Sequence, residues 1–357
     1  MKKLNFIAVA FIIILNMSCE RDIEIVNIDN DDTSVSNGTT SSDGMELELT
    51  KKRDQPSLPL SHFDFETNTI MVSVGNDQFP VVDAGEGPVA LLIHGWPDSK
   101  EMWRYQIPFL VNAGYRVIAP DLRGFGGAPK TQDIAAYGLG ALMSDIITIL
   151  DNMGIDNVNL VTHDWGAAIG WTMARYRPEY VNSFVTISIG ATGNPGFDLM
   201  EQRRMNWYLY MFAQEGMGAY ELSKNDWYLF RSIVFHPDED TIIDNLSEPD
   251  ALTTSMKPYQ ANFAETLLAA CPGQTYNPGN VDIEYPLVTA PTLGLLGKYD
   301  FAMLQPQMIY SKDYVVAGNF KYKYFDDVGH WMMLEKPKRI NTIIKNFLDC
   351  HALSDCN

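Results

Sequence analysis

The chain has 357 residues, of which 46% are hydrophobic, so it is long enough to bury one large core or two. Its formal net charge of −19 argues against a nucleic-acid partner, because surfaces that bind nucleic acids are basic. Much of this charge is local, since residues 20–50 hold nine acidic residues and one basic residue.

Residues 1–18 have the pattern of a secretory signal peptide. Lys2 and Lys3 precede the apolar run LNFIAVAFIIILNM, which is short for a membrane-spanning helix. Cys19 directly follows Ser18, and this ending resembles a bacterial lipoprotein box. We therefore expect an exported lipoprotein that touches a membrane only through a lipid on Cys19. The alternative is an ordinary signal peptide and a secreted protein.

Residues 19–57 are rich in Asp, Ser, Thr, Asn and Gly and poor in apolar side chains, so they are predicted to be a disordered acidic tether. Near the other end of the sequence, Cys350 and Cys356 lie six positions apart, and export favours a disulfide between them. Cys271 is then left over and is expected to be a small buried apolar residue.

From about residue 68 the sequence alternates between strand and helix patterns. Residues 69–75 and 78–85 read as an antiparallel hairpin. Further strands are predicted at 88–95, 115–121, 157–163, 181–189, 290–297 and 321–327. Helices are predicted at 139–154, 167–178 and 335–350. This order predicts an α/β fold with a mostly parallel, doubly wound sheet and helices on both faces.

The strand–helix alternation breaks between residues 193 and 285. This stretch is rich in Trp, Tyr, Met and Phe at helical spacing and contains no strand pattern. We interpret 193–285 as a helical cap inserted into a core made of 58–192 and 286–357.

The segment VTHDWGAAIG, residues 161–170, has the pattern of a nucleophile elbow. An apolar run leads into a tight turn and then into a helix of small residues, as in the motif Gly-x-Ser-x-Gly. Here Asp164 takes the serine position, Thr162 takes the first glycine position and Gly166 takes the second.

Asp164, Asp300 and His330 follow apolar runs in the order nucleophile, acid, histidine, which is the order of an α/β-hydrolase triad. Taken singly, Asp164 could cap a helix, Asp300 could be a polar turn residue and His330 could be an ordinary loop histidine. Their joint occurrence at the ends of predicted strands favours a catalytic triad.

The motifs HGWP, DLRGFGGAPK, HDWGA and GHWMMLEKP, together with the Asp300 segment, resemble those of epoxide hydrolases of the α/β-hydrolase fold. Haloalkane dehalogenases are close relatives that share HDWG. The resemblance covers about residues 60–350 and implies an α/β-hydrolase fold with an inserted helical cap.

A carboxylate nucleophile indicates a particular chemistry. With a pKa near 4, a carboxylate such as Asp164 is ionised at neutral pH and needs no base to activate it. It can attack an epoxide or a carbon–halogen bond and form an alkyl ester. His330 is suited to activate the water that cleaves this ester, and Asp300 to orient the imidazole and stabilise its charged form.

Negative charge develops on a carboxyl oxygen of Asp164 while the ester is cleaved, and backbone N–H groups stabilise such charge. By resemblance, the donors of this oxyanion hole are the backbone N–H groups of Trp96 and Trp165. Pro97 is similar to the family's cis-proline, which aims the Trp96 N–H. Both tryptophans can also pack in the core.

The resemblance implies two cap residues that donate protons to the epoxide oxygen. The first is Tyr208, with Tyr210 as the alternative, and the second is Tyr259. The segment around Tyr259 resembles a Tyr-Arg-x-Asn turn in which Gln260 replaces the arginine. A phenol with a pKa near 10 keeps its proton at neutral pH and can share it with an alkoxide.

The sequence thus predicts an epoxide hydrolase that acts on a small apolar epoxide. One alternative is a haloalkane or haloacid dehalogenase with the same triad, although dehalogenases often have Asn at the Trp96 position. Another is a non-catalytic surface lipoprotein that uses the fold for binding. The sequence contains no cofactor motif, and its six histidines are not spaced like metal ligands.

Overall fold

A computed structural model of the chain describes residues 63–268 and 285–352. The predicted signal peptide, the lipidation site Cys19, the acidic tether, Cys271 and Cys356 lie outside these residues. Cys350 is disulfide-bonded. Because Cys356 is not described, the predicted Cys350–Cys356 pair stays a prediction.

An eight-stranded sheet forms the centre of the described structure, with the order β1-β2-β4-β3-β5-β6-β7-β8. β2 pairs with β1 and β4 in antiparallel fashion, and the pairs from β4 to β8 are parallel. The strands are β1 (Thr69–Val74), β2 (Asp77–Ala84), β3 (Val89–Ile93), β4 (Arg116–Pro120), β5 (Val158–His163), β6 (Val181–Ile187), β7 (Thr292–Tyr299) and β8 (Phe320–Gly329). This is the predicted mostly parallel sheet.

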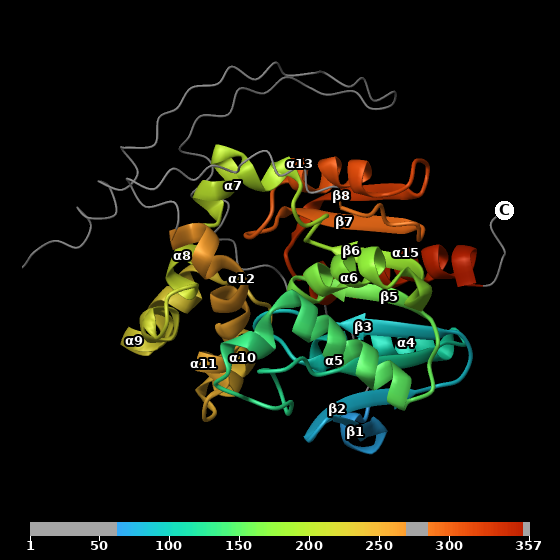
Figure 1. The fold of residues 1–357 in the computed structure, drawn as a ribbon, viewed down its shortest axis with the longest axis horizontal. Helices are drawn as coiled ribbons and strands as arrows, with labels where there is room; N and C mark the ends of the chain where they lie inside the picture. The colour runs from blue at the N-terminus through green and yellow to red at the C-terminus, as the bar shows by residue number, and fades with distance from the viewer. Residues whose placement is uncertain (1–62, 269–284, 353–357) are drawn as a thin grey trace, which may run out of the picture. The chain divides into compact units, whose positions relative to one another are not determined.

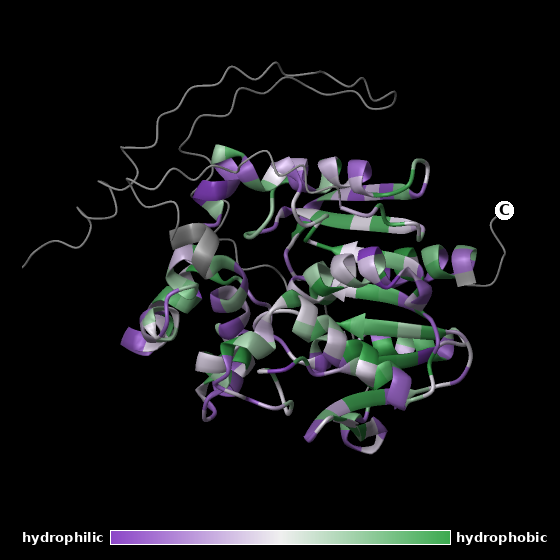
Figure 2. Ribbon diagram, viewed as in Figure 1, coloured by the Kyte–Doolittle hydropathy of each residue, from purple (hydrophilic) through white to green (hydrophobic). Residues whose placement is uncertain are grey.

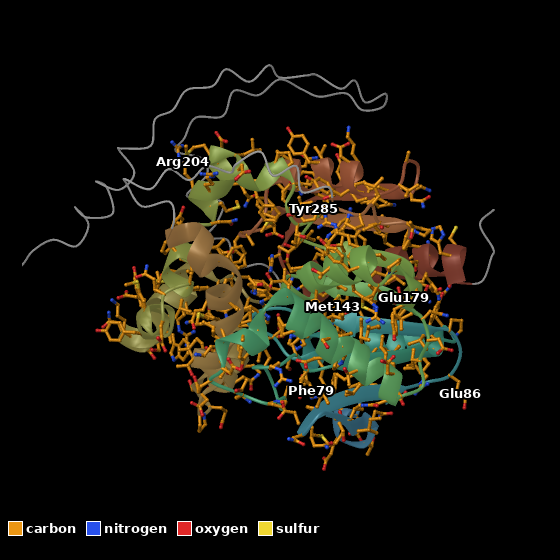
Figure 3. All side chains as sticks on the ribbon, in the orientation of Figure 1. Phe79, Glu86, Met143, Glu179, Arg204 and Tyr285 are labelled. Carbon is orange, nitrogen blue, oxygen red and sulfur yellow. The ribbon has the colours of Figure 1, made fainter. Side chains whose placement is uncertain are left out.

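The central strands are buried on both faces, which explains their continuous apolar runs. Every residue of β5 is buried, and β3, β4 and β6 are nearly so. Figure 2 shows these strands coloured mainly as hydrophobic. Charged side chains such as Glu86 and Arg204 instead point away from the ribbon at its periphery (Figure 3).

Helices cover both faces of the sheet (Figure 1). α5 and α6 pack together on one face, and α4 and α15 pack together on the other. The helices outside the cap are α3 (Phe65–Asn68), α4 (Gln106–Asn112), α5 (Leu139–Asn152), α6 (Trp165–Tyr176), α13 (Gln305–Ile309), α14 (Met332–Glu335) and α15 (Pro337–Ala352). The 3-10 helices there are η1 (Lys100–Trp103), η2 (Ile134–Tyr137), η3 (Pro178–Tyr180) and η5 (Tyr310–Tyr314).

The described residues between β6 and β7 form the inserted helical cap. Its elements are η4 (Pro195–Asp198), α7 (Met200–Met205), α8 (Tyr208–Phe212), α9 (Met217–Ile233), α10 (Glu239–Ser247), α11 (Ala251–Ser255) and α12 (Lys257–Leu268). In Figure 1, α8, α9 and α12 lie to the left of the sheet, beside the loops that follow the parallel strands. No helix within the described ranges is long and apolar enough to cross a membrane.

Two local differences from the predicted elements have clear causes. α6 begins at Trp165, two residues earlier than predicted, because the tight turn at Asp164 leads directly into the helix. The pattern analysis did not predict α4, which contains Pro108. Proline is compatible with the first turn of a helix, where the backbone N–H groups have no intrahelical acceptor.

Candidate active site

Asp164 occupies a strained turn between β5 and α6. Its backbone has φ 52° and ψ −121°, a conformation that residues with a side chain rarely adopt. Its carboxylate makes no capping hydrogen bond to α6, so the helix-cap alternative does not apply. The turn depends on small neighbours: a Cβ on Gly166 would lie 2.2 Å from the Ile93 carbonyl oxygen, and one on Gly95 would lie 2.4 Å from the Asp164 Cβ.

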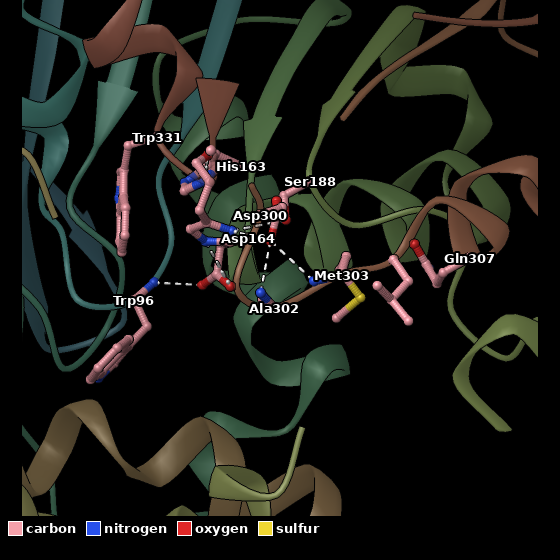
Figure 4. Close-up of polar contacts among 12 residues, drawn as sticks. Trp96, His163, Asp164, Ser188, Asp300, Ala302, Met303, Gln307 and Trp331 are labelled. Atoms are coloured by element: carbon pink, nitrogen blue, oxygen red, sulfur yellow. Dashed lines mark hydrogen bonds and ion pairs between the residues drawn. The ribbon is translucent and has the colours of Figure 1, made fainter. Parts of the chain in front are cut away.

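Two backbone N–H groups contact the Asp164 carboxylate. The Trp96 N–H donates to Oδ1 over 2.7 Å, as Figure 4 shows, and the Trp165 N–H also bonds to the carboxylate. The Trp96–Pro97 peptide bond is cis. Both tryptophans are buried, so they pack in the core as well as presenting their N–H groups. The structure thus brings together the residues predicted for the oxyanion hole.

His330 follows β8 and lies between the two carboxylates. Its Nε2 is 3.7 Å from Oδ2 of Asp164 and makes no hydrogen bond within the described residues. Its Nδ1 is 3.0 Å from Oδ1 of Asp300. Nδ1–H therefore donates to Asp300. In the neutral imidazole the Nε2 lone pair faces the Asp164 carboxylate, where a water molecule could be activated.

Asp300 is held in place by the loop that follows β7. Its Oδ1 also accepts hydrogen bonds from the backbone N–H groups of Ala302 at 2.8 Å and Met303 at 3.0 Å (Figure 4). The side chain is buried. These bonds aim the carboxylate at His330 and keep it from rotating.

The pKa values in this cluster are shifted by burial and by the neighbouring charges. Burial raises the pKa of Asp164, although His330 and the two N–H groups oppose it. Burial also acts to raise the pKa of Asp300, but the His330 charge and hydrogen bond outweigh it and lower that pKa. For His330, burial acts to lower the pKa, but Asp300 and then Asp164 outweigh it and raise it.

Tyr208 on α8 and Tyr259 on α12 are buried cap tyrosines on which the charge of Asp164 acts. Their side chains are 7% and 4% exposed, whereas Tyr210 is 40% exposed. Burial raises the pKa of both phenols, and the Asp164 carboxylate raises them further. The two phenols also interact electrostatically with each other. The structure therefore buries Tyr208, unlike Tyr210, together with Tyr259 within the electrostatic reach of Asp164.

The Tyr259 ring packs in an aromatic cluster above the elbow, 5.0 Å from the ring centroids of both Trp165 and Phe212. Gln260, which replaces the arginine of the similar turn, is buried. Asn262 in the same helix bonds to the Leu139 N–H and the Tyr137 carbonyl of the core. This asparagine anchors α12 against the core and so fixes the position of Tyr259.

The pattern analysis missed two buried polar residues beside His330. The Nε2 of His163 is 3.1 Å from the His330 carbonyl oxygen, and burial followed by the His330 charge lowers the pKa of His163 to about 3. The Oγ of Ser188 is 3.1 Å from Nδ1 of His330. Both residues end or directly follow a parallel strand, and that position was the available signal.

His94 of the HGWP motif has a structural role. Its Nδ1 is 2.9 Å from the Gly95 carbonyl oxygen, and its Nε2 accepts the Leu122 N–H at 2.9 Å. Both ring nitrogens are thus occupied by the backbone. Among the described residues, no three His, Cys, Asp or Glu side chains are grouped so that they could hold a metal ion.

Known proteins are similar to this chain in sequence and in fold. Residues 88–337 match the family model of the alpha/beta hydrolase fold. The chain is 26% identical to epoxide hydrolase A of Mycobacterium tuberculosis, with 78% of this chain and 96% of the relative covered. It is 28% identical to epoxide hydrolase 1 of Siraitia grosvenorii, with 81% and 98% covered.

A solved structure of an epoxide hydrolase mutant from Vigna radiata superposes with a TM-score of 0.65 at 25% identity, covering 79% of this chain and 98% of that one. The family match, the sheet order and the Asp164–His330–Asp300 geometry agree with one another. The chain belongs to the α/β hydrolase fold family and is a hydrolase.

Proposed function

We propose that this protein is an epoxide hydrolase that forms a covalent ester on Asp164. The observation that carries the proposal is the surroundings of the Asp164 carboxylate: His330, paired with Asp300, lies 3.7 Å away, and the charge of Asp164 acts on the buried phenols of Tyr208 and Tyr259. The names of the similar proteins from Mycobacterium tuberculosis and Siraitia grosvenorii support the same activity.

In the first step, one oxygen of Asp164 attacks an epoxide carbon and displaces the ring oxygen. A carbon–oxygen bond to Asp164 forms as the ring carbon–oxygen bond breaks. The departing oxygen takes up a proton from Tyr208 or Tyr259, because an alkoxide is a much stronger base than a phenolate. Apolar and aromatic walls around the tyrosines favour a small apolar substrate.

In the second step, water cleaves the ester. Esterification removes the negative charge of Asp164, which is one of the charges that raise the pKa of His330. The imidazole then loses its proton more readily and can accept one from water. The hydroxide attacks the ester carbonyl, and the Trp96 and Trp165 N–H groups stabilise the resulting oxyanion. The oxyanion then collapses, the bond between the Asp164 carbonyl carbon and the ester oxygen breaks, and the leaving alkoxide takes the proton held by His330. The proton left on the Asp164 carboxyl restores the phenol, and the product is a vicinal diol.

The geometry favours an epoxide over a halide as the leaving group. A halide ion is stabilised by side-chain N–H donors, but the indole N–H of Trp96 donates to Oγ of Ser255 at 3.3 Å. Two phenols instead face the nucleophile, as a departing oxygen requires. A purely binding role has no need of a histidine that is hydrogen-bonded to a buried acid and lies 3.7 Å from a carboxylate on a strained turn.

A His330→Gln variant tests the covalent mechanism. Alkylation of Asp164 does not need the imidazole, whereas hydrolysis of the ester does, so the variant should accumulate covalent enzyme. Its intact mass should rise by the full mass of the epoxide, because ring opening expels nothing. The label should map to the peptide that holds Asp164 and should be lost in Asp164→Ala.

The wild-type protein supplies the control, with vicinal diol measured as the product. If His330→Gln stays unlabelled with an epoxide that the wild type hydrolyses, direct attack of water replaces the covalent mechanism. If a haloalkane, but no epoxide, is turned over with release of halide, the protein is a dehalogenase.

A further inference from the structure

Ser188 occupies a conformation that costs free energy. It directly follows β6, has φ 73° and is fully buried. The Ile189 N–H donates to the Ile187 carbonyl over 3.0 Å, so Ser188 is the central residue of a γ-turn with positive φ. This kind of turn is rare and strained, above all for a residue with a side chain.

The surrounding structure holds this turn rigidly. The Ser188 N–H donates to the Leu295 carbonyl on β7 at 2.9 Å. The Ile189 carbonyl accepts hydrogen bonds from the indole N–H of Trp171, at 3.1 Å, and from the Thr186 hydroxyl. A strained residue that its neighbours fix so firmly suggests a functional use for its side chain.

The Ser188 hydroxyl lies at the junction between the histidine and its acid. Its Oγ is 3.1 Å from Nδ1 of His330. It also lies close enough to the Asp300 side chain to help lower the pKa of that carboxyl, after the larger effects of burial and His330. Nδ1 already carries the proton that it donates to Oδ1 of Asp300, so the hydroxyl cannot donate to Nδ1. Oδ2 of Asp300 makes no hydrogen bond within the described residues, so it is a free acceptor toward which the hydroxyl can turn.

We propose that Ser188 is a positioning residue for ester hydrolysis. Its hydroxyl donates a hydrogen bond to Asp300 and so holds the Asp300–His330 pair in its reactive orientation. This inference rests on the proposed epoxide hydrolase function. Figure 4 shows Ser188 beside Asp300, on the side of the pair away from Trp96. Ser188 does not itself contact the nucleophile or the substrate.

The hydroxyl also sets the charge balance of the pair. A hydrogen bond from the hydroxyl to Asp300 reduces how strongly the charge of that carboxylate stabilises the imidazolium. Removing the hydroxyl should therefore raise the pKa of His330. Other titratable groups also face the pair, and they are unchanged by a substitution at Ser188. They are Asp98 after β3, His163 at the end of β5, Asp164 at the elbow, Tyr208 on α8 and Tyr324 on β8.

Two substitutions separate the hydroxyl from the strain. Ser188→Ala removes the hydroxyl and keeps the strained turn, whereas Ser188→Gly removes both, because glycine adopts positive φ readily. The glycine variant should therefore melt at a higher temperature than the alanine variant. Both should nevertheless hydrolyse the Asp164 ester about tenfold more slowly, the effect of one hydrogen bond to a charged group.

The measurement is single-turnover kinetics with styrene oxide as probe, in which alkylation and hydrolysis are followed separately by rapid quench and intact mass. Alkylation should stay within about twofold of wild type, since the hydroxyl bonds to the acid–histidine pair and not to the nucleophile. Because hydrolysis needs neutral His330, the pH at which its rate is half-maximal should move upward in both variants.

Ser183→Ala is the matched control. Ser183 lies on β6, the strand that Ser188 follows, and is also fully buried. Its substitution also removes a hydrogen bond, to Oδ1 of Asn159 at 2.9 Å, but Ser183 is not part of the site. It should lower the melting temperature and leave the pH profile of hydrolysis unchanged.

The positioning role is wrong if the Ser188 variants keep the wild-type hydrolysis rate and pH profile, or if their pH profile moves downward. It is also wrong if both half-reactions fall together, as after a purely structural defect. A wild-type protein that converts none of a panel of epoxides to diols would instead contradict the proposed function itself.

Discussion

Tyr208 and Tyr210 lie two positions apart on one short helix and have opposite surroundings. Tyr208 is buried, and its pKa is raised by this burial and by the charges of Asp164 and Asp300. Tyr210 is 40% exposed. This pair supplies a test with a built-in control. Tyr208→Phe should slow alkylation of Asp164 by about 100-fold, the contribution of a general acid, and Tyr210→Phe should have no effect. Alkylation rates from single-turnover kinetics decide which of the two tyrosines is the proton donor.

If Tyr208→Phe and Tyr210→Phe slow alkylation equally, the assignment of the first acid is wrong. If neither variant is slowed, Tyr259 alone protonates the departing oxygen. The affinity for substrate should change little in both variants, because phenylalanine preserves the aromatic surface of the pocket.

Single buried polar residues explain how the triad is held together. His163 contacts the His330 carbonyl, and Ser188 contacts the His330 ring. Neither residue has a sequence motif that reports this contact. Their partners are 142 or more positions away in the sequence, so only the completed sheet brings them together.

At the scale of whole elements, the elbow depends on close contact between α6 and β3. A Cβ on Gly166 would meet the Ile93 carbonyl oxygen at 2.2 Å, so Gly166→Ala must push the helix away from the strand. We expect it to destabilise the protein by about 2 kcal/mol or more. Gly140 on α5 is the control, because it is exposed and has nothing within 4 Å of the added Cβ.

Gly140→Ala should stabilise the protein by about 0.5–1 kcal/mol, since alanine favours the helix over glycine. Denaturant unfolding of both variants measures these free energies. Comparable stability of the two variants would show that the contact between α6 and β3 relaxes without cost.

The cap elements are joined to the catalytic loops by buried hydrogen bonds. Gln202 on α7 donates to the Ala302 carbonyl at 2.7 Å and accepts the Leu304 N–H at 2.8 Å, so it holds the loop that orients Asp300. His236, after α9, bonds to Asp98, which also accepts the indole N–H of Trp331. The cap therefore supports both the acid loop and the histidine loop, in addition to supplying the two tyrosines.

At the scale of the whole molecule, we propose that the enzyme is exported and anchored by a lipid on Cys19. A single lipidated cysteine after an apolar segment predicts that the full-length protein partitions into detergent when it is expressed in a bacterium. Cys19→Ser should move it into the aqueous phase with its hydrolase activity intact, because the catalytic groups lie between Trp96 and His330. The measurement is phase partitioning with a detergent. If the full-length protein and Cys19→Ser are both found in the aqueous phase, the protein has no lipid anchor.

Much of the fold followed from periodicity. The apolar runs predicted each strand of the sheet, and the break in their rhythm predicted the helical cap, because burial on two faces imposes a continuous apolar pattern. Short elements such as α4 escaped prediction, since about two helical turns that include Pro108 leave little periodic signal. The beginning of α6 differed because the geometry of the elbow, rather than helix propensity, determines where that helix starts.

The sequence by itself determined which chemistry to expect: an aspartate at the elbow, followed in order by an acid and a histidine at later strand ends, predicts a carboxylate nucleophile. Only the tertiary structure decided which tyrosine faces Asp164 and that Ser188 bonds to the Asp300–His330 pair. The physical reason is that local patterns report burial and turns. Contacts between residues far apart in the chain depend on the register of the parallel strands and on how the cap packs against their ends.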